Sequence, residues 1–291
     1  MTAQPTTSTP TAQDLGFAAR ANASGRTPVV FVHGLWLHAG SWQPWVELFE
    51  SAGYAAHAPG WPGDGATVAE TRAHPEALAG VGVEQVTERF RQVIDALDVP
   101  PIVVGHSFGG LVAQKLLGEG LARAAVAVDP AQMRGVLRLP VVQLWNALPV
   151  LGNPAQLRGT NSQSADRFAR TFANAVPRAE SDEIHARWTI PAPGRPLFEA
   201  AVANLLAGTP AAVRTGADRG PLLVIGAGRD RTVPAVTTRA IAARYRAASS
   251  ITEYEEFPGK GHSLVVDSGW REVADYALQW LTFVGQPART A

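Results

Sequence analysis

Short runs of mostly apolar residues recur along the chain and are separated by segments with the period of a helix. Six such runs predict strands, at residues 29–32, 54–58, 102–104, 124–128, 222–225 and 251–257. Continuous apolar runs, unlike alternating ones, are typical of strands that are covered on both faces. The pattern therefore predicts a sheet that is mostly parallel.

The segments between these runs have apolar residues three or four positions apart, as the buried stripe of a helix requires. One stripe consists of Val83, Val86, Phe90, Val93, Ile94 and Leu97, and another, near the C-terminus, of Val273, Tyr276, Ala277, Trp280 and Leu281. Strands that alternate with such helices are typical of βαβ units. The predicted fold class is α/β, a doubly wound and mostly parallel sheet flanked by helices.

Residues 131–215 interrupt this alternation. They contain eight prolines and no strand-like run, but helical patterns appear at 166–175 and 197–206. A structureless connection of this length is improbable inside a compact domain. We therefore predict a helical cap at 131–215, inserted into a core formed by residues 27–130 and 216–291.

Residues 1–26 are rich in Thr, Ala and Pro, which predicts a mostly disordered leader. The first ten residues have neither the basic nor the apolar segment of a secretory signal. No stretch of the chain approaches the ~20 apolar residues of a membrane helix. These observations favour a cytoplasmic protein without a membrane partner.

Composition narrows the function classes. Twenty-five basic residues balance twenty-five acidic ones, so nucleic acid is not an expected partner. The chain has no cysteine, which excludes disulfides, thiolate metal sites and a cysteine nucleophile. No set of His, Asp and Glu residues has metal-ligand spacing, so neither a metal nor a cofactor is expected. The oligomeric state is not indicated.

A serine between glycines follows the third predicted strand and precedes a helical segment. Residues 105–109 read G-H-S-F-G, the G-x-S-x-G pattern in the strand–turn–helix context that exposes a nucleophile. Side chains at Gly105 and Gly109 would collide with the backbone of so tight a turn. At the start of a helix, backbone N–H groups also favour developing negative charge. Ser107 is therefore the predicted nucleophile.

A serine hydroxyl needs a neighbouring base and a group that orients this base. His262 follows the last predicted strand and belongs to the same sheet edge as Ser107, so it is the predicted base. Asp230 follows the strand at 222–225 and is the preferred third member. Asp129 leaves the sheet at the same edge and stays open as an alternative acid.

Acyl transfer also requires donors for the oxyanion. The residue after the nucleophile supplies one backbone N–H, which here belongs to Phe108. The loop after the first strand supplies the other, and Leu35 is the candidate because Gly34 lets this loop approach closely. His33 is expected to have a structural role.

Five motifs in chain order, FVHGLW, APGWPGDG, GHSFGG, GRDRTVP and GKGHS, resemble those of the α/β-hydrolase superfamily, in its small capped esterase-like branch. The resemblance covers residues 28–284 and includes the triad order Ser107, Asp230, His262. It implies the α/β-hydrolase fold and an acyl pocket over Ser107 built by the cap. The tryptophans expected to bind substrate there are Trp36, Trp61, Trp145 and Trp188.

The predicted function is hydrolysis of a small, fairly apolar carboxylic ester or lactone through an acyl-enzyme. Carbon–carbon bond hydrolysis, amide or carbamate cleavage and perhydrolysis use the same triad and remain alternatives. A different class, a small-molecule receptor with little turnover, is also compatible with the fold. Relatives that open epoxides or dehalogenate carry Asp at the nucleophile position, so Ser107 disfavours those reactions.

Overall fold

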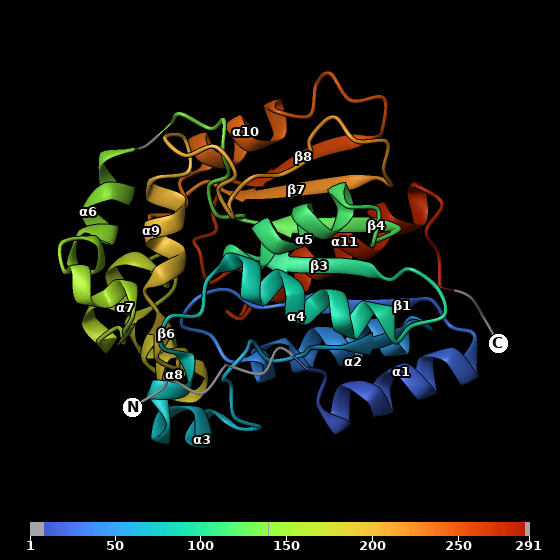
Figure 1. Ribbon diagram of the computed structural model, residues 1–291, viewed down its shortest axis with the longest axis horizontal. Coiled ribbons are helices and arrows are strands. Elements are labelled where there is room, and N and C mark those ends of the chain that lie inside the picture. The colour runs from blue at the N-terminus through green and yellow to red at the C-terminus, as the bar shows by residue number, and fades with distance from the viewer. Residues whose placement is uncertain (1–8, 139, 289–291) are drawn as a thin grey trace.

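Six parallel strands form the centre of the protein (Figure 1). The computed structural model describes residues 9–138 and 140–288. The strand order is β2-β1-β3-β4-β7-β8, and every neighbouring pair is parallel. The strands are β1 (Pro28–Val32), β2 (Ala55–His57), β3 (Ile102–His106), β4 (Ala124–Val128), β7 (Leu222–Ala227) and β8 (Thr252–Phe257). Each coincides with one of the six predicted runs, so this part of the prediction is confirmed.

Successive residues of the central strands point to opposite faces, where they belong to two separate hydrophobic clusters. Val30 and Val32 pack with apolar residues of α1, α4, α5 and α10, whereas Val29 and Phe31 pack with α2 and α11. These helices are α1 (Ala12–Ser24), α2 (Gln43–Ser51), α4 (Val83–Asp95), α5 (Phe108–Gly118), α10 (Ala235–Ala243) and α11 (Trp270–Phe283). Helices on both faces confirm the doubly wound fold.

Between β4 and β7 the chain forms a helical insertion, seen at the left of Figure 1. Its helices are α6 (Val141–Leu151), α7 (Ala165–Thr171), α8 (Arg178–Trp188) and α9 (Arg195–Ala201). It also contains an antiparallel pair, β5 (Thr160–Asn161) and β6 (Ala192–Pro193). The sequence did not indicate this pair, because strands of two residues are too short to leave a periodic pattern. One further short helix, α3 (Val68–Ala73), follows β2.

The prediction of a disordered leader was wrong where the structure describes it; residues 1–8 lie outside the described residues. Thr11 caps α1, a helix of thirteen residues that packs against the core. The Phe17 ring stacks on the His57 ring at 4.9 Å, and the buried Asp14 carboxylate accepts a hydrogen bond from His57 Nε2 at 2.9 Å. The Ala-rich composition suggested disorder, but a few large or charged residues with tertiary partners are enough to order the helix.

The Asp14 carboxylate joins α1 to α4, because it also pairs with the buried Arg89 guanidinium. Burial alone would raise the pKa of Asp14, but hydrogen bonds from His57, Thr11 and Arg89 outweigh it and hold this pKa below its ordinary value. The ionised carboxylate therefore stabilises the fold above pH 3.8, the ordinary value, and this contribution is lost as the pH falls further.

We expect Asp14→Asn to lower the free energy of unfolding at pH 7 by about 2–4 kcal/mol, because Arg89 is left buried without its counter-charge. Denaturant unfolding at pH 7 and pH 3 tests this. The gap between wild type and variant should narrow at pH 3, because the unfolded wild-type chain binds a proton at Asp14 below pH 3.8 while the folded protein keeps this carboxylate ionised. A gap that is equal at both pH values would show that the carboxylate charge is not the cause. Leu15→Ala, an exposed change on the same helix, is the control.

Candidate active site

Ser107 lies at the junction between β3 and α5, in a backbone conformation that few residues adopt. Its φ and ψ angles are 55° and −121°, and this strain is of the kind that persists only when neighbouring structure holds it in place. The Ser107 N–H donates to the Val128 carbonyl at 2.9 Å, and the Ser107 carbonyl accepts from the Ala131 N–H at 2.8 Å. The end of β4 thus holds the serine in place.

Two glycines allow this turn to form. A Cβ atom on Gly105 would lie 2.0 Å from the Gly109 carbonyl oxygen, and one on Gly109 would lie 2.1 Å from the Val32 carbonyl oxygen. Both distances are far below van der Waals contact, and the colliding atoms are backbone. Glycine is therefore required at both positions, as the sequence motif predicted.

His262, in the turn that follows β8, is fully buried and forms a hydrogen bond with Asp230. Its Nδ1 lies 2.5 Å from Asp230 Oδ2. The other carboxylate oxygen, Asp230 Oδ1, accepts from the backbone N–H groups of Thr232 and Val233, which fixes the orientation of the carboxylate. Within the described part of the chain, His262 Nε2 has no hydrogen-bond partner. The ring is thus oriented through one nitrogen, and the other nitrogen is available.

Asp129, the alternative acid, lies in the same cluster but farther from the imidazole. Its Oδ2 is 4.0 Å from His262 Nδ1, and its Oδ1 accepts from the Ala227 N–H at 2.8 Å. Burial raises the pKa of Asp129 well above its ordinary range, and the nearby Asp230 carboxylate raises it further. The geometry therefore favours Asp230, the preferred candidate, as the partner of His262.

Asp129, Asp230 and His262 also bring three ligand-type atoms within 4.8 Å of one another. Two atoms that ligate one tetrahedral zinc ion at ~2.1 Å each are roughly 3.4 Å apart. The 2.5 Å between Asp230 Oδ2 and His262 Nδ1 is much shorter than this separation and is that of a hydrogen bond. We therefore interpret the cluster as a hydrogen-bonded acid–imidazole pair with a second acid beside it.

A second histidine lies next to Ser107 and packs against His262. The rings of His106 and His262 are 4.5 Å apart, and Phe172 of the insertion contacts both. Burial lowers the pKa of His106 well below its ordinary value, and the neighbouring His262 adds to this effect. His106 therefore acts as a neutral packing residue and links the serine turn to the His262 turn.

The loop after β1 lies directly against Ser107. A Cβ atom on Gly34 would be 2.7 Å from Ser107 Cβ and 3.4 Å from Ser107 Oγ. Leu35 follows on this loop, and the next residue, Trp36, has a positive φ of 66°. His33 supports the loop, because its Nδ1 donates to the Gly34 carbonyl at 2.9 Å and its Nε2 lies 2.9 Å from Asp64 Oδ2. The expected structural role of His33 agrees with these contacts.

A cavity of about 120 Å³ lies over Ser107 and Phe108. Its wall is mostly apolar and comes from the loop after β1, the turns after β4 and β7, and the insertion. The inner side of α6 contributes Gln143, Leu144, Asn146, Ala147 and Leu151, and α9 contributes Leu197, Ala200 and Ala201. The insertion thus forms one side of the space in front of the serine.

Of the four tryptophans expected to bind substrate, only Trp36 lines this cavity. Trp145 is 72 % exposed and points away, because a helix that turns residues 143, 144 and 147 inward turns residue 145 outward. Trp61 stacks on His33, and Trp188 lines a different hollow beside α8. The expectation for these three residues therefore does not agree with the structure.

Two buried glutamines in the wall were not found by sequence reasoning. Gln132 and Gln163 line the cavity, and Gln163 Oε1 is buried without a hydrogen-bond partner among the residues that the structure describes. Gln132 comes soon after Asp129 at the end of β4, the edge of the sheet where ligands are expected. That position could have indicated Gln132 as a residue of the cavity wall. Gln163 lies in the insertion and had no such signal.

A model of the alpha/beta hydrolase family matches residues 29–276, which include the serine turn, Asp230 and His262. The chain belongs to the alpha/beta hydrolase family.

The relatives of this alpha/beta hydrolase include a monoacylglycerol lipase of Mycolicibacterium smegmatis, 27 % identical over 265 residues that make up 88 % of each chain. Among solved structures, the monoacylglycerol lipase of Paleococcus ferrophilus matches with a TM-score of 0.65 and 20 % identity, over 89 % of this chain and 98 % of that one. An extracellular alpha/beta-hydrolase from a Paenibacillus species gives the same score and identity, over 87 % and 98 %. At such low identity, the structural matches support the fold alone.

Proposed function

We propose that this alpha/beta hydrolase cleaves a small, fairly apolar carboxylic ester or lactone through an acyl-enzyme, with Ser107 as nucleophile, His262 as base and Asp230 as the orienting acid. One observation carries the proposal. His262 is bound to Asp230 through Nδ1, has no hydrogen-bond partner at Nε2 among the described residues, and packs on the residue that precedes a strained serine. This arrangement is what a serine nucleophile requires.

In the first half-reaction, Ser107 Oγ attacks the ester carbonyl while His262 Nε2 takes the hydroxyl proton. The imidazolium that forms is stabilised by the Asp230 carboxylate, which is already fixed by two backbone N–H groups. The carbonyl oxygen becomes an oxyanion. The backbone N–H groups of Phe108 and Leu35 receive it, because the first N–H groups of a helix have no intrahelical partner and the Gly34 loop touches Ser107.

The first half-reaction ends when His262 gives its proton to the departing alkoxide and the bond between the carbonyl carbon and the leaving oxygen breaks, which leaves the acyl-enzyme. In the second half-reaction, His262 Nε2 takes a proton from a water molecule, and the water oxygen attacks the acyl carbon. The bond between this carbon and Ser107 Oγ then breaks, His262 returns the proton to Oγ, and the acid is released. Phe172 and His106 pack around the His262 ring and hold it in place through both steps.

The cavity and the relatives both bear on the substrate. The name of one relative, a monoacylglycerol lipase, supports hydrolysis of carboxylic esters. A cavity of about 120 Å³ is of the order that accommodates a benzene-sized group, since ~150 Å³ holds benzene in an engineered core. We therefore propose a short aliphatic or single-ring acyl group. The helical insertion would act as the cap that closes over this acyl group. The cytoplasmic location of the protein stays a prediction.

Labelling with a fluorophosphonate tests the nucleophile directly. We expect intact-mass spectrometry to show one adduct per chain, and peptide mapping to place it on Ser107. Labelling of another residue, or no labelling of a folded and ester-active protein, would contradict the proposal. A structure of the adduct would also show which wall residues contact the acyl group.

We expect kcat/KM to be at least about tenfold higher for aryl butyrates than for aryl laurates, because the cavity accommodates only a short acyl group. Leu197→Ala removes part of the wall and should shift this preference toward longer chains. Leu15→Ala, on α1 and outside the cavity, should leave it unchanged. A wild-type preference for laurate would mean that the acyl group binds elsewhere.

A further inference from the structure

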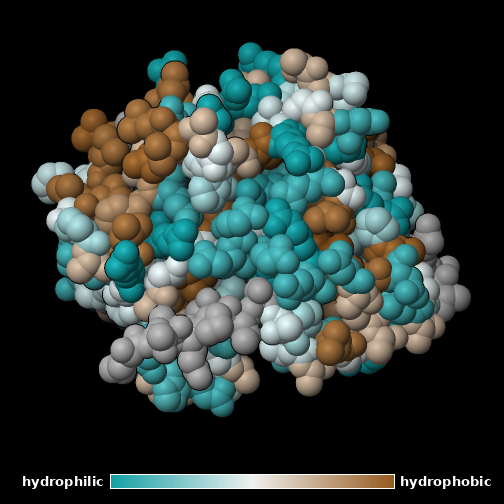
Figure 2. Space-filling model, viewed as in Figure 1, coloured by the Kyte–Doolittle hydropathy of each residue, from teal (hydrophilic) through white to brown (hydrophobic). Residues whose placement is uncertain are grey.

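The insertion carries a large exposed apolar surface outside the cavity. We use the term apolar face for the exposed residues of α6, of the segment before it and of the segment after α9; its members are Leu137, Val141, Trp145, Leu148, Leu205 and Leu206. Three of them are about four-fifths exposed: Leu137 at 78 %, Val141 at 80 % and Leu205 at 80 %. Figure 2 shows apolar residues gathered in this part of the molecule, where Figure 1 shows α6 and α9. Clusters of this kind mark interaction surfaces.

Hydrogen bonds join two parts of the apolar face, the segment before α6 and the segment after α9. Asn204 Oδ1 accepts from the Gly135 N–H, and Asn204 Nδ2 donates to the Val136 carbonyl. These bonds fix Leu205 beside the segment that carries Leu137. The face is therefore a defined surface, built from two parts of the chain that are far apart in sequence.

The charged residues within the two stretches that carry the apolar face are both arginines. Residues 134–151 and 202–208 include Arg134 and Arg138 but no Asp or Glu, although the whole chain is balanced at twenty-five of each sign. Arg134 and Arg138 are exposed beside Leu137. An apolar face with an arginine rim and an exposed tryptophan matches the interface of a bilayer with anionic headgroups.

A second copy of the chain fits this surface less well. In a two-fold dimer the same patch meets itself, so the arginine rims of the two copies would face each other without acidic partners. Anionic headgroups would neutralise them instead. The charge pattern thus favours a lipid surface over self-association.

We propose that the apolar face docks this protein onto the surface of anionic membranes. No helix in the described part of the chain is long and apolar enough to cross a bilayer. Leu144 is 45 % exposed and also lines the cavity over Ser107, so the apolar surface continues from the outside of α6 to the cavity wall. Docking would place this wall at the lipid surface, where apolar esters concentrate. This inference revises the expectation of no membrane partner and does not depend on which bond Ser107 cleaves.

Flotation with lipid vesicles tests the proposal. We expect the wild-type protein to float with vesicles made of equal parts of phosphatidylcholine and phosphatidylglycerol, and more weakly with pure phosphatidylcholine. Val141→Ser/Leu205→Ser should reduce the bound fraction about tenfold or more, because two apolar contacts are lost. Arg134→Gln/Arg138→Gln should reduce binding only to the anionic vesicles.

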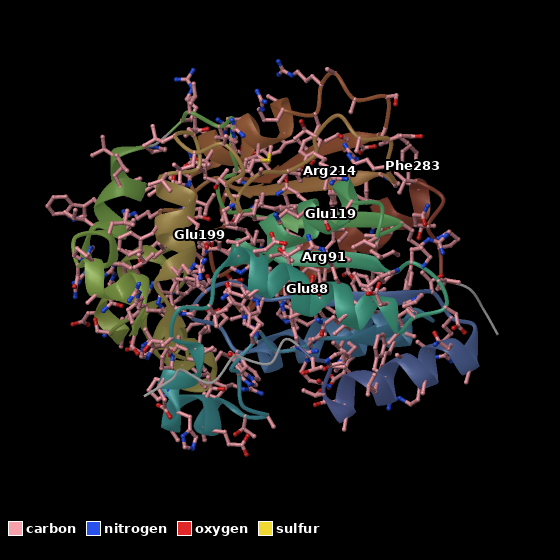
Figure 3. The ribbon with its side chains drawn as sticks, viewed as in Figure 1. Glu88, Arg91, Glu119, Glu199, Arg214 and Phe283 are labelled. Atoms are coloured by element: carbon pink, nitrogen blue, oxygen red, sulfur yellow. The ribbon has the colours of Figure 1, made fainter. Side chains whose placement is uncertain are left out.

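Phe283→Ser is the matched control. Phe283 is 81 % exposed and apolar, but it lies on α11, on the side of the molecule opposite α6 (Figures 1 and 3). This variant should float like wild type, and Val141→Ser/Leu205→Ser should keep wild-type activity on a water-soluble ester. The proposal is overturned if wild type stays below the vesicles, or if Phe283→Ser lowers flotation as much as the face variant. Light scattering that shows a dimer lost only in the face variant, without flotation, would identify a second copy as the occupant.

Discussion

Replacing Ser107 with alanine is expected to lower kcat on an activated aryl ester by ~10³-fold or more, with little change in thermal stability. Alanine fits the turn as serine does, because neither side chain is branched at Cβ and alanine only lacks the Oγ atom in the strained conformation at φ 55°. The variant removes the attacking oxygen but keeps the oxyanion donors and the cavity. Steady-state kinetics and thermal unfolding measure the two effects separately.

Ser41→Ala is the matched control for this experiment. Ser41 is 4 % exposed and Ser107 is 5 % exposed, but Ser41 is outside the cavity. Its replacement should leave kcat within about twofold of wild type, as expected for a change away from the reacting atoms. If Ser107→Ala retained full activity in a folded protein, the covalent mechanism would be wrong and the receptor alternative would have to be reconsidered.

Replacing Asp230 with asparagine is expected to lower kcat by about 10³- to 10⁴-fold, because an amide cannot stabilise the imidazolium and favours the wrong tautomer of His262. Asp129→Asn should stay within about threefold of wild type. The asparagine oxygen still accepts from the Ala227 N–H, and burial already favours the uncharged form of Asp129. The pair of variants therefore distinguishes the two acids that the sequence left open. Equal losses in both, or a larger loss in Asp129→Asn, would assign the role to Asp129.

The same pair makes a prediction about stability. The pKa of Asp129 is higher in the folded protein than its ordinary value of 3.8. Above pH 3.8 the unfolded chain releases this proton while the folded protein keeps it, so the free energy of unfolding falls as the pH rises. Asparagine has no such cost. The melting temperature of Asp129→Asn relative to wild type should therefore be higher at pH 7 than at pH 4. The reverse trend would mean that Asp129 is ionised in the folded protein.

Local patterns in the sequence were sufficient to predict the sheet and the serine turn. The central strands are buried on both faces, so their composition alone marks them. Gly105 is required by a collision with the Gly109 carbonyl inside the same turn, and Gly109 by a collision with the Val32 carbonyl of the neighbouring strand β1. The proximity of Asp230 and His262 could be predicted because the carboxyl ends of parallel strands meet at one edge. Each of these signals comes from a rule that acts over a few residues or over the topology of one sheet.

Tertiary packing alone decided the rest. The order of α1 depends on contacts of Asp14 and Phe17 with His57 and Arg89, which are forty or more residues away along the chain. His262 Nδ1 lies 2.5 Å from Asp230 and 4.0 Å from Asp129, and this difference depends on how two strand ends are placed side by side. Whether Trp145 lines the cavity or the outer surface depends on the rotation of α6. Composition and periodicity carry no information about such long-range distances and rotations, because these are set by the shapes of partners that the local sequence does not contain.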